Sequence, residues 1–108
     1  MNSVDLFSLI LHRVAAEKLR ADETGVLKIA RSNLKRWLSS GRFDSVAKRA
    51  LLEWNEIIKH SPADEIIRLI TQDNDEGQRL RSSSSFAGVL TKAERGKIWS
   101  ECAEIRPA

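Results

Sequence analysis

The chain has 108 residues, of which 42% are apolar and 31% charged, with a formal net charge of +3. This composition indicates a globular protein with one modest core and excludes a disordered chain. Cys102 is the only cysteine, so no intrachain disulfide can form, and the apolar run over residues 6–11 is far too short to span a bilayer. We therefore expect a soluble protein of the cytoplasm.

The spacing of apolar residues predicts three long helices in the first sixty residues. The first covers about residues 4–20, where apolar side chains recur every three or four positions. The second begins near residue 22 or 24 and ends at Ser39-Ser40-Gly41, where Gly41 suits a left-handed C-terminal cap. The third follows Asp44 and Ser45, which can cap its first turn.

Shorter helices are predicted in the rest of the chain. Ser61 is suited to be the N-cap of a fourth helix, with Pro62 at the first helical position. Residues 73–76 have the spacing of a capping box, but Gly77 weakens any helix that follows. Residues 91–94 form an S/T-x-x-E capping box that opens the last helix.

No stretch alternates between apolar and polar residues for long enough to predict a strand, and no internal repeat is evident. We predict an all-α fold, a compact bundle of about four to six short helices with no sheet. A single helical domain is expected over residues 1–108. It would comprise a main bundle over 1–71, an irregular serine-rich segment over 72–90 and a C-terminal helix over 91–108.

Few residues are suited to catalysis. His12 and His60 lie far apart in sequence, and neither has Cys, Asp or Glu at the spacing of metal ligands. His12 is expected on a mostly polar edge of its helix, and His60 at a helix end, where it can cap carbonyl groups. Cys102 has no general base that the sequence identifies, and the glycines form no phosphate-binding loop. We expect no catalytic residues, no metal and no cofactor, so the protein is not expected to be an enzyme.

A basic segment is the first candidate binding surface. Asp44 is the only acidic residue between residues 28 and 49. The segment could meet DNA through a helix-turn-helix around Gly41, a protein or nucleotide partner, or only water. The connection over 39–45 is longer than the usual turn of that motif, and Glu53 and Glu56 on the second helix would repel phosphate. The residues of this basic surface are Lys28, Arg31, Lys35, Arg36, Lys48 and Arg49.

The four consecutive serines are the second candidate surface. Leu80 and Phe86 flank them and can be buried, and the neighbouring arginines suit carboxylate or phosphate. Four extended residues span only about 13 Å, which favours a docked segment over a linker between domains. The segment could dock on its own core or on a partner, and we expect the partner.

The three tryptophans differ in their surroundings. Trp37 and Trp54 fall on apolar stripes and are expected in the core. Trp99 lies on a weakly apolar helix and is a candidate anchor for a partner, because Trp is enriched in interface hot spots. The predicted partner-binding residues are Arg79, Arg81, Ser82, Ser83, Ser84, Ser85, Phe86 and Trp99.

Three stretches of the sequence resemble a family of small bacterial helical proteins. They are His12-Arg13, residues 30–37 (ARSNLKRW) and residues 79–90 (RLRSSSSFAGVL), the last followed by Glu94-Arg95. Genes of this family lie beside genes for AbiEii-like (Men-type) nucleotidyltransferases, and the two proteins are regarded as toxin–antitoxin pairs. The likeness extends over residues 12–95. It departs from the family pattern at Ser85, where the family has a proline that would fix φ and restrict the preceding residue.

The resemblance implies an antitoxin without chemistry of its own. It would bind a cognate nucleotidyltransferase toxin in a hetero-oligomer and occlude the active-site cleft, its arginines facing the acidic, metal-binding carboxylates of that cleft. Two alternatives rest on the residues alone: a DNA-binding transcriptional regulator and a non-catalytic protein-interaction adaptor. No membrane partner is expected.

Overall fold

The computed structural model describes residues 3–105, which form helices and connections without a strand. The predicted all-α bundle is therefore confirmed, while residues 106–108 of the expected C-terminal helix lie outside the described residues. No helix in the described range is long and apolar enough to cross a membrane. The elements are α1 (Ser3–Ala21), α2 (Glu23–Ser39), α3 (Ser45–His60), α4 (Ala63–Thr71), α5 (Asp75–Arg81), the 3-10 helix η1 (Ser85–Val89) and α6 (Lys92–Ile105).

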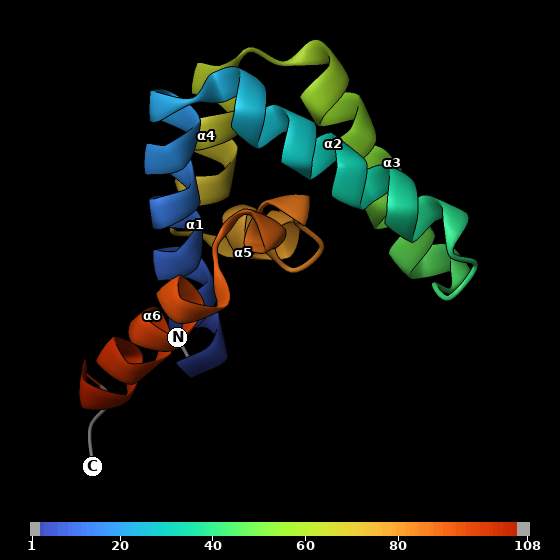
Figure 1. Ribbon diagram of the computed structural model, residues 1–108. Coiled ribbons are helices and arrows are strands. Elements are labelled where there is room, and N and C mark those ends of the chain that lie inside the picture. Colours follow the sequence, from blue (N-terminus) through green and yellow to red (C-terminus); the bar gives the residue numbers. More distant parts are fainter. Residues whose placement is uncertain (1–2, 106–108) are drawn as a thin grey trace.

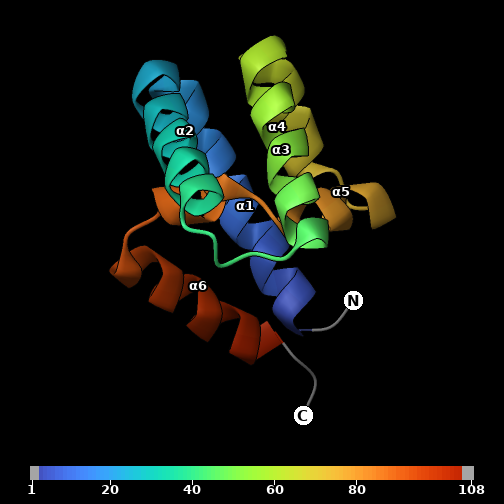
Figure 2. The same cartoon turned by 90° about the vertical axis from the view of Figure 1, so that its right-hand side faces the viewer.

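The helices pack around α1, which contacts α2, α4, α5, α6 and η1. Figure 1 shows α1 and α4 side by side, with α2 and α3 projecting from them as an antiparallel hairpin. Helix α6 lies at the other end of the molecule from that hairpin, as Figures 1 and 2 show. Because so many elements cover α1, its buried surface is wider than one apolar stripe.

Polar residues begin the first helices much as the sequence predicts. Asp22 alone separates α1 from α2, and its carboxylate accepts the Gly25 backbone N–H at 3.1 Å. The carboxylate of Asp44 accepts the Ala47 N–H at 2.8 Å and caps α3. Gly41, just after α2, has the expected positive φ of 71°.

Two predicted caps are placed differently. Ser61 is not the N-cap of α4, because its backbone N–H donates to Ile57 O at 2.9 Å and so completes α3. Pro62 takes the N-cap position of α4, with no hydrogen bond from a capping side chain. In the following segment the cap is Asn74, whose side chain accepts the Gly77 N–H at 2.8 Å.

The segment over 72–90, expected to be irregular, contains α5 and η1. Gly77 allows α5 to approach α4 closely, since a Cβ there would lie 2.0 Å from the Gln72 carbonyl oxygen. The weak helix propensity of this glycine is therefore offset by a packing requirement. The capping box of α6 is confirmed: Thr91 Oγ1 accepts the Glu94 N–H at 3.1 Å, and Glu94 Oε1 accepts the Thr91 N–H at 2.9 Å.

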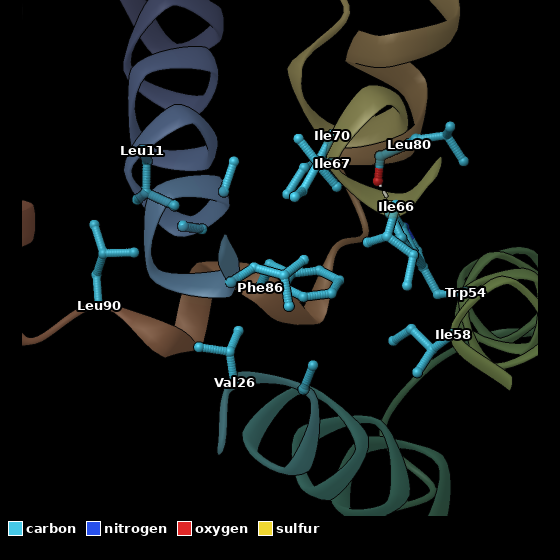
Figure 3. Close-up of a cluster of buried hydrophobic side chains, with 14 of the residues drawn as sticks. Leu11, Val26, Trp54, Ile58, Ile66, Ile67, Ile70, Leu80, Phe86 and Leu90 are labelled. Carbon is cyan, nitrogen blue, oxygen red and sulfur yellow. Dashed lines mark hydrogen bonds between the residues drawn. The ribbon is translucent and has the colours of Figure 1, made fainter. Parts of the chain in front are cut away.

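The centre of the core is an aromatic pair. The rings of Trp54 in α3 and Phe86 in η1 meet edge to face with centroids 5.7 Å apart, and both side chains are fully buried. Figure 3 shows Phe86 surrounded by side chains of the other elements, and the Trp54 indole N–H donating to Leu80 O, at 2.7 Å. Trp54 thus has the predicted core position, and Trp37 is half-buried against the same core.

Candidate partner-binding surfaces

Most of the serine-rich segment packs on the protein's own core. Ser84, Ser85 and Phe86 are buried, whereas Ser82 is exposed and Ser83 half-buried. The Ser84 hydroxyl accepts the Phe86 N–H at 3.0 Å and so begins η1. Ser84, Ser85 and Phe86, which were expected to contact a partner, are therefore not accessible to one in this fold, because burial of the Phe86 ring draws the two serines inward.

Two sequence stretches singled out above, residues 30–37 and 79–90, meet at this point. The Asn33 side chain, buried in α2, donates to Ser85 O at 3.2 Å. A Cβ at Gly88 would lie 2.5 Å from the Asn33 amide nitrogen, so the glycine permits the close approach. These residues hold α2 against η1, which is a structural role.

Arg81 is also buried, contrary to the expected role in partner binding. Its Nη1 donates to Gln72 O at 2.7 Å and to Ile70 O at 3.4 Å, both at the C-terminal end of α4. A cation in this position satisfies orphan carbonyls and complements the helix dipole. Desolvation lowers the pKa of Arg81, an effect that nearby Asp73 opposes. The guanidinium is thus a cap for α4.

His12 is buried rather than lying on a polar helix edge, because α1 is covered on several sides. Its Nδ1 lies 2.7 Å from Ser8 O and must carry the proton, since a carbonyl can only accept. Burial lowers the pKa of His12 from 6.5 to about 4, and the charge of Arg81 acts in the same direction. His60 caps no carbonyl; its exposed ring lies 3.1 Å from a Glu56 oxygen.

Arg79 is exposed, but its charge is offset within the chain. The guanidinium donates to both oxygens of Glu53, at 2.8 and 3.0 Å, and to both oxygens of Glu76. Hydrogen bonding from Arg79 lowers the pKa of each of these carboxyl groups. The residue links α3 to α5 and presents little net charge to a partner.

The predicted basic surface is exposed, and most of its charge is free. Within residues 3–105 no carboxylate oxygen lies within 4 Å of the charged groups of Lys28, Arg31, Lys35, Lys48 or Arg49. Arg36 is also exposed and donates to Asn33 Oδ1 at 2.8 Å, which is a neutral acceptor. Most exposed cations of the described chain that lack a carboxylate within 4 Å lie on the α2–α3 hairpin; the others are Arg13 of α1 and Lys92, Arg95 and Lys97 of α6.

A groove of about 590 Å³ separates α2 from α3 on one face of the hairpin. We call it the basic groove. The sequence prediction included Lys48 and Arg49 of α3 but missed Lys59, although Lys48, Leu52, Asn55 and Lys59 recur at the helical spacing of four, three and four. No carboxylate lines the basic groove; its lining is Arg31, Lys35, Leu38 and Ser39 of α2 with Asn55, Ile58 and Lys59 of α3.

The hairpin differs from a helix-turn-helix. That motif crosses its two helices at about 90–120°, so that the second can enter a major groove. Here α2 and α3 lie side by side and antiparallel along the hairpin, as both views show. Helix α3, the expected recognition helix, therefore packs against α2 on one side, and Glu53 on another side forms a salt bridge with Arg79.

A smaller, more apolar hollow of about 290 Å³ lies at the tip of the hairpin. Its walls are Trp37, Phe43, Ala47 and Leu51 on one side and residues 82–84 on the other, so the serine-rich segment does reach the surface here. Phe43 is a partly exposed apolar residue that sequence reasoning overlooked. The sequence feature that could have indicated this hollow is a phenylalanine in the short connection between two helices.

Trp99 has half of its surface exposed, and its ring packs edge-on against Phe7 of α1 with centroids 5.2 Å apart. It therefore holds α6 to α1 and remains accessible to a partner. Among residues 3–105 there is no cluster of His, Cys, Asp and Glu that could hold a metal ion. Comparison with protein-family models, curated proteins and solved structures found no match to this chain.

Proposed function

We propose that this protein is an antitoxin that binds a nucleotidyltransferase toxin and occludes its active-site cleft. The observation that carries the proposal is the basic groove, a concentration of cations with no carboxylate among them. Nucleotidyl transfer needs metal ions held by carboxylates, so the cleft of such an enzyme is acidic. Opposite charge on two facing surfaces steers association and fixes their orientation.

The resemblance to the antitoxin family is the second support. The structure changes which residues we assign to the contact, because Arg81 and Phe86 are buried and Arg79 is paired with carboxylates. We assign the contact instead to Arg31, Lys35 and Lys59 of the basic groove, with the exposed Ser82 at the tip of the hairpin.

A search of the adjoining genes for a nucleotidyltransferase, followed by co-expression of the two proteins, tests the proposal. We expect growth to be restored and nucleotidyl transfer by the purified toxin to be inhibited. The double substitution Arg31→Glu and Lys35→Glu should weaken inhibition at least tenfold, the effect of losing about 1.4 kcal/mol of binding free energy. The matched control is Lys92→Glu with Lys97→Glu, two exposed lysines of α6 at the other end of the molecule.

Substitutions are preferable to truncation for this purpose. Deleting residues 79–108 would remove Leu80, Phe86 and Ile98 from the core and unfold the chain, whatever its role in binding. A wild-type chain that neither restores growth nor binds the enzyme would refute the antitoxin function. Equal inhibition by the α2 and α6 variants would instead show that the contact lies elsewhere.

A further inference from the structure

We propose that the basic groove binds an amphipathic helix of the partner, with aliphatic residues on its inner face and Asp or Glu along both edges. The inference depends on the proposed function only in assigning that helix to the toxin. It follows from two properties of the groove, an aliphatic floor and cationic rims.

The floor is formed by side chains that an aliphatic residue would cover. Leu38 of α2 and Ile58 of α3 line the groove. Leu52, on the same stripe of α3 as Asn55 and Lys59, has 47% of its surface exposed. Burying such surface stabilises a complex by roughly 25 cal/mol for each Å² removed from water. Helices that dock in grooves do so through aliphatic anchors at this kind of floor.

The rims carry cations at helical intervals. Arg31 and Lys35 line the groove from α2, about 6 Å apart at a rise of 1.5 Å per residue, and Lys28 lies on the same face of α2 just beyond the lining. On α3, Lys59 lines the groove, and Lys48 lies about 16 Å from it by the same measure, outside the lining. Carboxylates at steps of three or four on a partner helix would lie opposite these cations.

Nucleic acid fits this groove less well. Interfaces with nucleic acid are polar, and single strands are held on aromatic side chains that stack with bases. The lining of the basic groove contains no aromatic side chain, and its floor is aliphatic. A phosphate backbone would engage the rims and leave the exposed aliphatic surface of Leu38 and of the neighbouring Leu52 in water. The aliphatic floor therefore favours an acidic, amphipathic protein segment over nucleic acid as the ligand of the groove.

Titration of the full chain with a synthetic peptide tests the inference. The probe is a helical peptide of about 14 residues with Leu along one face and Glu on both edges, compared with a scrambled peptide of equal composition and with duplex DNA. We expect the amphipathic peptide to bind more tightly than either, and less tightly at 300 mM than at 50 mM salt. Amide chemical shifts should change along α2 and α3.

Three variants locate the binding. Arg31→Glu with Lys35→Glu should weaken peptide affinity at least tenfold, and Leu52→Ser should weaken it severalfold by removing exposed aliphatic surface beside the floor. The Lys92→Glu, Lys97→Glu control should not change it. All these side chains are exposed, and circular dichroism verifies that each variant is folded. Equal affinity for the scrambled peptide, or tighter binding of DNA, would overturn the inference.

The peptide assay and the toxin assay can fail independently. Specific peptide binding without neutralisation of the toxin supports the helix-binding groove and counts against the antitoxin function. Neutralisation that survives the Arg31→Glu, Lys35→Glu change, together with no peptide binding, refutes the groove and leaves the antitoxin function standing.

Discussion

Mild acid should destabilise this protein through His12. The pKa of His12 is about 4 in the folded chain because the ring is buried, and 6.5 is its ordinary value when exposed. The unfolded chain therefore binds a proton at a pH where the folded chain does not. Stability from the neutral ring is fully present above pH 6.5 and is lost as the pH falls toward 4.

The magnitude follows from the two pKa values. Their difference corresponds to about 3 kcal/mol when the loss is complete, and to about 2 kcal/mol between pH 7.5 and pH 5. Protonation would place a charge at Nε2, a buried atom with no hydrogen-bond partner among the described residues. The glutamates whose pKa is lowered, Glu53, Glu65, Glu76 and Glu94, lose their contributions only below about pH 4.5.

Urea denaturation at pH 7.5, 6 and 5 measures the effect, with an expected fall of about 1–2 M in the midpoint. His12→Gln removes the titration and should flatten this pH dependence, although it also alters the contact with Ser8. His60→Gln is the matched control, since His60 is the other histidine and is exposed. The reasoning is refuted if unfolding free energy is constant over this range, or if His12→Gln keeps the wild-type slope.

Four further substitutions test the packing and the caps, with urea midpoints as the measurement for the first three and thermal melting for the last. Gly77→Ala should destabilise the protein by at least about 2 kcal/mol, because the added Cβ would lie 2.0 Å from the Gln72 carbonyl oxygen at the end of α4. Gly96→Ala, where the added Cβ meets open space, should stabilise α6 by about 0.5–1 kcal/mol. Equal effects at the two glycines would contradict this. Trp54→Phe removes the donor to Leu80 O and should cost about 1–2 kcal/mol, whereas an unchanged midpoint would mean that the bond contributes nothing. Thr91→Ala removes the N-cap of α6 and should cost about 1 kcal/mol, detectable as earlier loss of helicity on heating; the same melting curve as wild type would show that the box is dispensable.

Local sequence signals predicted the helices well. Apolar spacing located the long helices to within a few residues, and the positive φ at Gly41 and the capping box at 91–94 followed from side-chain chemistry alone. These features depend on residues close in sequence. The Ser61 cap failed because the end of α3 and the start of α4 compete for the same residue.

The candidate site was less predictable because burial depends on distant neighbours. Periodicity identifies one apolar stripe, so it could not show that α1 is covered widely enough to bury His12. The sequence around Arg81 does not show that the end of α4 lies beside this arginine in the fold. It also does not show that Ser84 and Ser85 are buried because Phe86 packs in the core. The composition of the basic surface was predicted, but the basic groove depends on how α2 pairs with α3.

The position of Phe86 in the sequence also determines when the core can form during synthesis of the chain. The ring at the centre of the core belongs to residue 86 of 108, and Asn33 must wait for Ser85 before its buried amide finds an acceptor. Ser85 follows Asn33 by 52 residues, so at about 5–20 residues per second a ribosome adds it about 3–10 s later. Until then helices α1 to α4 lack the side chain that joins them and are open to chaperones and proteases. The core can therefore form only after Phe86 has been made, and a nascent chain interrupted before this residue would lack its core.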